Sequence, residues 1–256
     1  MANRWKNWLG QQIPLAKTLA VGGADFWRSL NFWMNKTDRE EMYAIFENCK
    51  NLEDYFQFSS KMFGLDQIKD EIIAFLEFAK AEKLNYVCEI GTARGGNTFL
   101  LGQALPSTRF ILALDLHVRN KSQLHYFSYS SKTISFINGS SKTKSTIDKV
   151  KSILGSNKID LLFIDGDHTY NGVKQDFLNY KNIVQEGGII VFHDIVPDYR
   201  TRYGIETKRW VGDVPLFWSK IKQKYPHYEF VKNPEQDGFG IGAIRYSAQI
   251  DVPDNL

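Results

Sequence analysis

The chain has 256 residues, of which 43% are hydrophobic and 24% charged, and its formal net charge is +3. These proportions exclude disorder over most of the chain, and no stretch reaches the ~18 uninterrupted apolar residues of a membrane-spanning helix. The excess of positive charge lies in residues 1–40, with six basic and three acidic residues, so no nucleic-acid-binding surface is expected on the remainder.

Residues 1–64 are predicted to form a helical, aromatic-rich N-terminal extension. Pro14 and Gly22-Gly23 are expected to break it into pieces. It holds four of the six tryptophans, and helical spacing places several apolar residues on one face. The tryptophans are Trp5, Trp8, Trp27 and Trp33, and the face is Phe26, Leu30, Trp33 and Met34. Such a segment fits a lid or a contact in a homo-oligomer, a membrane-surface anchor, or a substrate-binding cap.

Two cysteines, Cys49 and Cys88, lie far apart in the sequence and show no metal-binding or redox spacing. A disulfide scaffold is therefore excluded. Polar residues such as Lys17 interrupt the N-terminal segment, which makes it a poor signal peptide. The simplest location is the cytoplasm, with attachment at the membrane surface as the alternative.

Residues 65–246 are predicted to form one α/β domain, followed by a C-terminal tail at 247–256. Asp66 is expected to cap a helix whose apolar face begins at Ile68. Apolar strands then alternate with helices, which is typical of a parallel sheet covered on both faces. The predicted strands are 86–90, 110–114, 133–137, 159–164, 188–192, 228–231 and 240–244, and the helices between them are 97–105, 120–129, 142–155, 171–184 and 213–224.

Ligands of such sheets bind beyond the carboxyl ends of the strands, so the residues there predict the site. Glu89 and Gly91 end the first strand, and Gly95 and Gly96 follow, where the absence of a Cβ lets backbone approach a ligand. Asp115 ends the next strand, and a carboxylate at this position can accept hydrogen bonds from both hydroxyls of a ribose. The sequence therefore indicates a ligand that contains a nucleoside.

The spacing of the glycines argues against two common nucleotide sites. The loop reads G-x-x-x-G-G, whereas a dinucleotide site has G-x-G-x-x-G and a P-loop has Gly-Lys followed by Ser or Thr. Glu89 would repel a pyrophosphate but suits a cationic ligand. A nicotinamide-dependent oxidoreductase is therefore the less favoured alternative.

The loop with Asp115 resembles the S-adenosylmethionine site of class I methyltransferases. The later segment D-G-D-H-T-Y at 165–170, then Val173, Asp176, Gly187-Gly188 and His193-Asp194, resembles a branch that contains O-methyltransferases of sugars and natural products. The resemblance covers residues 65–246. It implies a Rossmann-like, seven-stranded, mostly parallel sheet with the last strand antiparallel, and transfer of a methyl group to a hydroxyl of a small sugar-like or natural-product acceptor.

The resemblance also implies roles for individual residues. Glu89 and Gly91 would lie near the methionine part of the cofactor, and Asp115 near its ribose. Ser140 follows the third strand, where the superfamily often has a polar or acidic residue near the adenine. Asp165 would lie close to the methyl-transfer centre.

The chemistry requires alignment of donor and acceptor and removal of a proton from the acceptor hydroxyl. His168 is the best-placed candidate base, because the unperturbed pKa of histidine lies near neutral pH. His117 and His125 also follow a strand and compete for this role. A non-catalytic binding module with the same fold is the alternative function, and the presence of Asp165, His168 and Asp194 argues against it.

A divalent metal is the alternative way to activate the hydroxyl. Asp165, His193 and Asp194 end two neighbouring strands and would hold Mg²⁺ or, since imidazole is a poor magnesium ligand, Mn²⁺. A basic cluster follows the fifth strand and fits either a solvated loop or a site for an anionic acceptor. Its members are Arg200, Arg202, Lys208 and Arg209.

Overall fold

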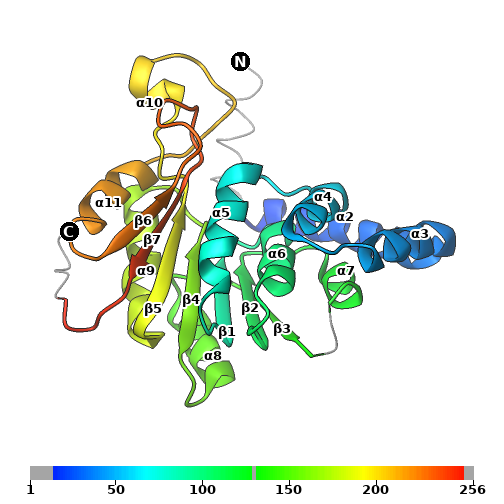
Figure 1. Cartoon of the computed structure of the whole chain (residues 1–256). Coiled ribbons are helices and arrows are strands. Elements are labelled where there is room, and N and C mark those ends of the chain that lie inside the picture. The colour runs from blue at the N-terminus through cyan, green and yellow to red at the C-terminus, as the bar shows by residue number, and fades with distance from the viewer. Residues whose placement is uncertain (1–13, 129–130, 251–256) are drawn as a thin grey trace.

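A seven-stranded sheet forms the centre of the computed structural model, which describes residues 14–128 and 131–250 (Figure 1). Its strands are β1 (Tyr86–Ile90), β2 (Phe110–Asp115), β3 (Thr133–Asn138), β4 (Ile159–Ile164), β5 (Val184–His193), β6 (His227–Phe230) and β7 (Ile241–Arg245). Their spatial order is β3-β2-β1-β4-β5-β7-β6, and β7 runs antiparallel to both of its neighbours. The predicted fold class is confirmed, including the antiparallel last strand.

The strands in the middle of the sheet are mainly apolar because helices cover both faces. All six residues of β4 are buried, as expected for a parallel strand without a solvent-facing side. In the register, Ile90 lies opposite Leu114 on one side and Ile164 on the other. The carboxyl ends of β1, β2 and β4 therefore meet at one edge, which positions the loops that follow them.

Two apolar cores lie on the two faces of the sheet, one with α4, α5 and α6, the other with α8, α9 and α11. The helices of the domain are α5 (Lys69–Lys80), α6 (Gly96–Ala104), α7 (Lys121–Tyr126), α8 (Lys144–Leu154), α9 (Tyr170–Tyr180), α10 (Tyr199–Tyr203) and α11 (Val214–Ile221), with a 3₁₀ turn at Lys181–Ile183. The predicted helices lie within a few residues of those observed. The helix predicted at 171–184 ends at Tyr180, because Val184 already pairs with Ile159 as the start of β5.

The prediction that Asp66 caps the first helix of the domain is wrong. The helix begins at Lys69 after Ile68, whose side chain makes no capping hydrogen bond. Asp66 instead accepts a hydrogen bond of 3.0 Å from Arg209, a residue of the segment after β5. A contact with a distant segment thus replaces the local cap.

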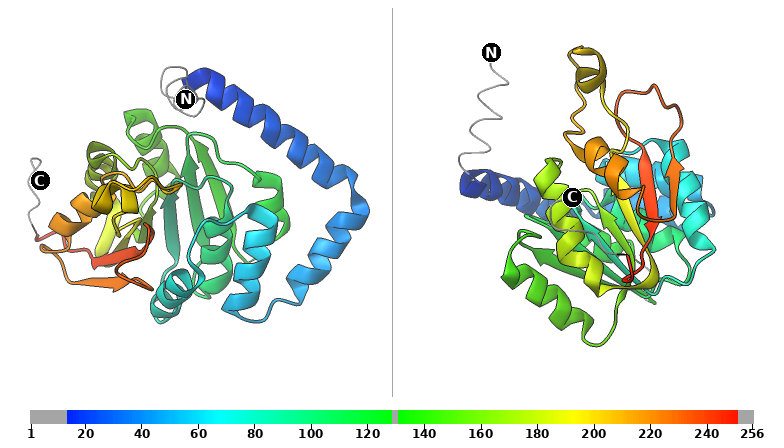
Figure 2. Two further views of the ribbon diagram at one scale, coloured as in Figure 1. Left: turned by 90° about the horizontal axis from the view of Figure 1, so that it is seen from above. Right: turned by 90° about the vertical axis from the view of Figure 1, so that its left-hand side faces the viewer.

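The N-terminal helix α2 (Pro14–Met34) is continuous, so the expected break at Gly22-Gly23 is wrong. Glycine inside a helix costs about 1 kcal/mol, which tertiary packing can offset. A Cβ on Gly22 would lie 3.4 Å from the imidazole of His117, which shows how closely the helix backbone approaches the loop after β2. Figure 2 shows α2 as a long rod, joined to the body through α3 (Lys36–Glu47) and α4 (Leu52–Phe63).

The two ends of the N-terminal extension are buried to different degrees. Phe58 and Phe63 of α4 are each 2% exposed and belong to the same core as α5 and α6. On α2, by contrast, Phe26 and Trp27 are each 62% exposed. Its Phe32 packs edge-on against Tyr126 and Phe127, at centroid distances of 5.4 and 5.8 Å. The buried side chains Phe46, Leu52, Phe58 and Phe63 of this extension therefore belong to the domain core.

The predicted apolar face of α2 points mainly to solvent, because Trp33 and Met34 are also exposed. Trp5 and Trp8 lie outside the described residues. Contact of this segment with a second copy of the chain or with a membrane surface stays a prediction. None of the helices described between residues 14 and 250 is both long and apolar enough to cross a membrane. Cys49 and Cys88 are both free, as expected.

Candidate functional site

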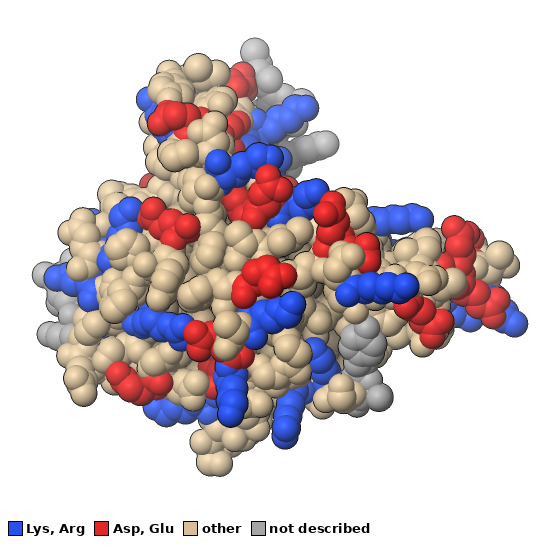
Figure 3. All heavy atoms as spheres, viewed as in Figure 1, with Lys and Arg blue, Asp and Glu red and all other residues tan. Residues whose placement is uncertain are grey.

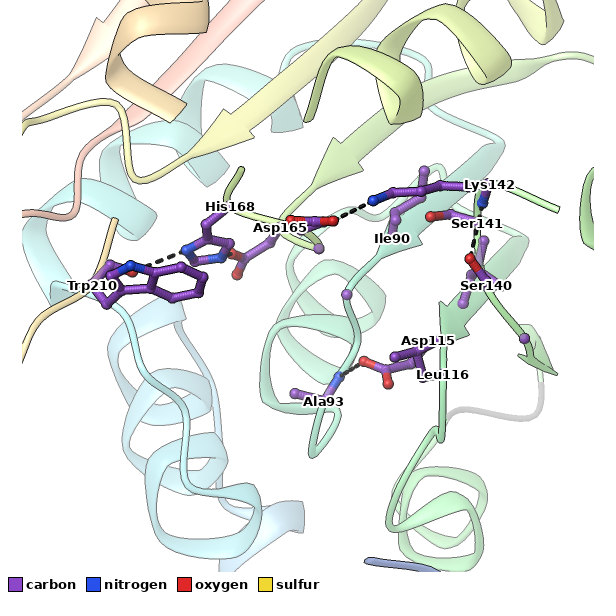
Figure 4. A pocket seen from close by; sticks show the side chains of 15 residues that line it. Ile90, Ala93, Asp115, Leu116, Ser140, Ser141, Lys142, Asp165, His168 and Trp210 are labelled. Atoms are coloured by element: carbon purple, nitrogen blue, oxygen red, sulfur yellow. Dashed lines mark hydrogen bonds and ion pairs between the residues drawn. The ribbon is translucent and has the colours of Figure 1, made fainter. Parts of the chain in front are cut away.

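A cavity of about 530 Å³ lies at the edge where the carboxyl ends of β1 to β4 meet (Figure 4). Loops after four strands form its wall, together with one residue of the segment after β5. The lining residues are Ile90, Gly91, Ala93, Leu114, Asp115, Leu116, Gly139, Ser140, Ser141, Lys142, Asp165, Gly166, Asp167, His168 and Trp210. The structure thus brings five of the predicted residues to one cavity, namely Gly91, Asp115, Ser140, Asp165 and His168.

Gly91 lets the loops after β1 and β4 pack directly on one another. Its φ is +93°, and a Cβ would lie 1.8 Å from the carbonyl oxygen of Asp165. The amide of Asp165 donates to the carbonyl of Ile90 at 2.8 Å, and the amide of Gly91 donates to that of Leu114 at 2.8 Å. Any side chain at position 91 would separate these loops and displace Asp165.

Asp115 is held with its carboxylate at the cavity wall. One oxygen accepts the amide proton of Ala93 at 2.8 Å, and the other accepts that of His117 at 2.9 Å. Each carboxylate oxygen has a further lone pair. Asp115 can therefore accept two more hydrogen bonds, in the fixed orientation that a ribose diol requires.

Glu89, Gly95 and Gly96 lie behind the wall of the cavity. Glu89 is 1% exposed and accepts hydrogen bonds from Asn97 and Thr98 of α6. Burial is the main cause that raises its pKa to about 7, against the opposing effect of those hydrogen bonds. A Cβ on Gly95 would lie 2.5 Å from Leu124, and one on Gly96 would lie 3.1 Å from Leu65. The absence of a Cβ at Gly95 and Gly96 thus lets Leu124 and Leu65 pack against the backbone of this loop.

Beyond β3, the wall contains polar residues that the sequence reasoning did not pair. Ser140 lines the cavity, and its neighbour Ser141 donates a hydrogen bond of 2.5 Å to the buried Asp176. Lys142 forms an ion pair with Asp167 of the loop after β4. The sequence predicted neither contact, because each joins the segment after β3 to a residue that follows β4.

His168 stacks on Trp210 at the mouth of the cavity. The ring centroids are 5.4 Å apart with an interplanar angle of 11°, and His168 Nδ1 donates to the carbonyl oxygen of Trp210 at 3.1 Å. Figure 4 shows the indole beside the imidazole. The segment around Trp210 is fixed to the loop after β4, because the amide of Asp213 donates to the carbonyl of His168 at 2.8 Å. Trp210 was missed from sequence, since no spacing linked it to the strand ends.

Two histidines and two aspartates form a charge cluster beside the cavity. Asp165 lies 3.5 Å from His168 and 3.3 Å from His193, while Asp194 lies 3.4 Å from His168 and 3.5 Å from His193. Each aspartate thus contacts both imidazoles. Asp194 has a φ of +63°, a conformation that non-glycine residues rarely adopt. The turn at the end of β5 holds its carboxylate against both rings.

The cluster shifts the protonation of all four groups. Burial lowers the pKa of His168, but the hydrogen bond and charge of Asp165 and the charge of Asp194 raise it to about 9. Burial also lowers the pKa of His193, but the charges of Asp165 and Asp194 raise it to about 9. Burial opposes the charged form of Asp165, yet the two imidazoles keep its pKa below the usual range, whereas burial dominates and raises the pKa of Asp194. The two aspartates therefore favour the positively charged form of both imidazoles at neutral pH.

The residues that lie close enough to share a metal ion include His168, which was not in the predicted set. Asp165, His168 and Asp194 can each offer a ligand atom, all within 4.8 Å of one another. The predicted third ligand was His193, which is 5% exposed and directs Nδ1 at both carboxylates. Two carboxylates and an imidazole suit Mn²⁺ or Zn²⁺ better than Mg²⁺.

The competing histidines do not reach the cavity. His117 faces α2, with Nε2 3.8 Å from Asp25, and His125 packs edge-on against Phe136. The predicted basic cluster is also absent from the cavity wall: Arg202 bonds to Glu235, and Arg209 pairs with Asp66. On the face shown in Figure 3, basic and acidic side chains are interspersed.

The strand order and the antiparallel β7 define the Rossmann-like methyltransferase fold. Residues 88–195 match the family model described as a methyltransferase domain. An uncharacterized protein of Acanthamoeba polyphaga mimivirus is 37% identical over 126 residues, which are 46% of this chain and 54% of that protein. The match thus spans about half the length of that curated relative.

Solved structures of methyltransferases share the fold at low sequence identity. An O-methyltransferase from Bacillus cereus in complex with SAH has a TM-score of 0.55 at 14% identity, covering 78% of this chain and 93% of that one. The O-methyltransferase TomG from Streptomyces achromogenes, in complex with SAM, has a TM-score of 0.51 at 13% identity, covering 78% and 92%. MycE from the mycinamycin biosynthetic pathway, in complex with Mg and SAH, has a TM-score of 0.52 at 16% identity, covering 80% of this chain and 57% of MycE.

Proposed function

We propose that the chain is an S-adenosylmethionine-dependent methyltransferase that methylates a hydroxyl of a small acceptor. The observation that carries the proposal is one cavity that Asp115, Asp165 and His168 line together, within the segment that matches a methyltransferase domain. Its volume of about 530 Å³ falls within the ~300–1,000 Å³ typical of small-molecule sites.

The residues present fit this cofactor. Asp115 is preoriented for two hydroxyls, and Asp165 supplies negative charge toward a cationic sulfonium or ammonium group. Ser140 lines the end of the cavity beyond β3, where an adenine would extend from the ribose. When bound, the cofactor supplies an electrophilic methyl group. Glu89 supports the loop after β1 from behind, through its hydrogen bonds to α6.

His168 is the proposed base, acting in its neutral form. Its Nδ1 proton is held by the Trp210 carbonyl, so loss of the other proton leaves Nε2 free to accept one from the acceptor hydroxyl. Nε2 lies 3.5 Å from Asp165, which stabilises the imidazolium that forms. Because the pKa is raised to about 9, only a small fraction of His168 is neutral at pH 7 in the protein without ligands.

A divalent ion is a second route to the same activity, supported by the three ligand atoms of Asp165, His168 and Asp194. Such an ion would lower the pKa of the acceptor hydroxyl. Activity in excess EDTA separates the two routes: abolished activity that added Mn²⁺ restores supports the ion, and full activity leaves His168 as the base.

Trp210, at the mouth of the cavity, indicates the class of acceptor. Trp210 is 59% exposed and offers an aromatic surface beside His168. Flat C–H-rich faces of sugars and aromatic rings both pack well on indole. A sugar-like or natural-product hydroxyl is therefore the proposed acceptor.

Calorimetry tests the proposal directly. We expect S-adenosylhomocysteine to bind and NAD not to bind, whereas the reverse would favour a nicotinamide-dependent oxidoreductase. Mass spectrometry of the protein incubated with S-adenosylmethionine and a library of hydroxylated acceptors then detects methylated products. Binding without any product would support a non-catalytic module.

A further inference from the structure

A second cavity, of about 680 Å³, lies between α2, α3, α4 and α7, and we propose that it binds an uncharged, mainly apolar small molecule that carries an amide or similar donor–acceptor group. It shares no lining residue with the cavity at the strand ends. The proposal therefore concerns a separate site and does not depend on methyl transfer.

The apolar part of the wall is unusually rich in methionine. The chain has four methionines, and three of them, Met34, Met42 and Met62, line this cavity beside Phe32. Methionine side chains are flexible and polarizable, and they are used where a surface must adapt to a ligand. Met34 is 73% exposed, so the cavity opens to solvent and a ligand can enter.

The polar part of the wall contains a buried group without a partner. Gln123 of α7 is 1% exposed, and both its amide nitrogen and its amide oxygen lack a hydrogen-bond partner among the described residues. Such a group costs about 1–3 kcal/mol, which makes it rare in folded proteins. Because Gln123 lines the cavity, a ligand with one donor and one acceptor that reaches its amide would satisfy both atoms.

Other polar groups at the cavity already have partners within the protein. Asn35 caps α3 by accepting from the amide of Asp38 at 3.2 Å, and it donates to the Asp38 carboxylate at 2.6 Å. Arg28 donates to Asn120 at 3.4 Å. Arg28 and Asp38 carry opposite charges, so the wall has no net charge to attract an ion. An uncharged ligand is therefore favoured over a carboxylate or an amine.

The methionines also allow ligand binding at this cavity to be measured by NMR. With methyl-¹³C methionine, NMR gives one signal for each of Met34, Met42 and Met62, and Met1 serves as an internal reference. Hexanamide is the probe, because its primary amide can donate to and accept from Gln123. The matched probe is 2-heptanone, which has a similar chain and a carbonyl but no N–H. We expect saturable shifts of the three signals and about tenfold tighter binding of hexanamide, the effect of one buried hydrogen bond.

The variant Gln123→Leu should remove the preference for hexanamide, while 2-heptanone still shifts the three signals. Gln103→Leu is the matched control: it also carries a partly unpartnered amide, but the cavity beside it has a volume of only about 10 Å³. This variant should keep the preference. If the leucine variant does not fold, Gln123→Met retains the length of the side chain and serves instead.

Two results would overturn the proposal. One is a preference for hexanamide that persists without the amide at position 123, since the donor–acceptor group would then act elsewhere. The other is a change in the three signals with protein concentration alone, which would assign the cavity to contact with a second copy of the chain. Neither result bears on S-adenosylhomocysteine binding, so failure here and failure of the proposed function are distinguishable.

Discussion

The two cavities of this protein are similar in size, about 530 and 680 Å³, but they are built on opposite principles. At the strand ends, charged side chains from successive loops satisfy one another, as Asp165 does with His168 and His193. Between the helices, three methionines line the cavity together with Gln123, whose amide has no hydrogen-bond partner among the described residues. The first cavity thus holds paired charges in fixed positions, whereas the second has flexible side chains in its wall and a polar group left without a partner among the described residues.

The largest expected effect lies in the first cavity. His168→Asn should lower kcat by ~10²–10⁴, the usual weight of general-base catalysis, because asparagine cannot accept the proton. S-adenosylhomocysteine affinity should change little, since the proton leaves the acceptor. The matched control His125→Asn alters an exposed histidine outside the cavity and should retain wild-type kcat. Near-normal turnover by His168→Asn would make the residue a positioning one.

The pH dependence of kcat/KM should show how strongly His168 is paired with Asp165 and Asp194. With the pKa of His168 raised to about 9, kcat/KM should rise about tenfold per pH unit between pH 7 and 8, because only neutral imidazole accepts a proton. Steady-state rates in overlapping buffers measure this profile. A flat profile from pH 7 to 9 would contradict the assignment of His168 as the base.

The free energy of unfolding should fall as the pH rises, whereas activity should increase. The folded pKa values of His168 and His193, about 9, exceed the unfolded value of 6.5. Their contribution to the free energy of unfolding is therefore fully present below about pH 6.5 and is lost as the pH rises through about 9. Urea denaturation at pH 6.5 and pH 9 measures the loss, and equal stabilities would show that the two histidines are not paired in solution.

A smaller effect is expected from Asp115→Ala, which should weaken S-adenosylhomocysteine binding by ~1–3 kcal/mol, the cost of unpaired hydroxyls. Calorimetry measures the affinity, and circular dichroism checks that the fold survives. Asp148→Ala is the control, since Asp148 pairs with Lys144 on the exposed face of α8. Unchanged affinity in Asp115→Ala would mean that the ribose is held elsewhere.

The smallest effect should appear in the second cavity and should have the opposite sign. Gln123→Leu is expected to stabilise the ligand-free protein by about 1 kcal/mol, because it removes a buried amide that finds no partner in the described part of the chain. Gln103→Leu should destabilise it by a similar amount, since the amide of Gln103 donates to the carbonyl of Phe127 at 3.1 Å. Thermal unfolding of both variants measures whether each substitution stabilises or destabilises the protein. Destabilisation by Gln123→Leu would indicate that its amide already has a partner.

Much of the fold could be predicted because its signals are local. Runs such as Leu161–Ile164 are apolar without alternation, which is typical of a strand buried on both faces. The position of Asp115 at the end of such a run predicted that it lies at the edge formed by the carboxyl ends of the strands. The break expected at Gly22-Gly23 was wrong because the packing of α2 against His117 depends on a segment far away in the sequence.

The candidate site was predicted in its location but not in its interactions. Glu89 ends a strand as expected, yet α6 binds its carboxylate from behind the wall. Trp210 and His168 are 42 residues apart in the sequence, and no pattern joined them. Gln123 gave no signal at all, because a glutamine on a short helix is ordinarily solvated.

The sequence by itself determined the order of strands and helices and the edge at which Asp115, Asp165 and His168 meet. Hydrophobic periodicity reports on the residues next along the chain, and parallel strands bring their carboxyl ends to one side. Only the tertiary structure decided that Asp165 and Asp194 both contact His168 and His193, and that three methionines line a cavity together with an amide unpartnered among the described residues. Charge pairing, burial and cavity shape depend on groups from distant segments, and these distances are absent from any local pattern.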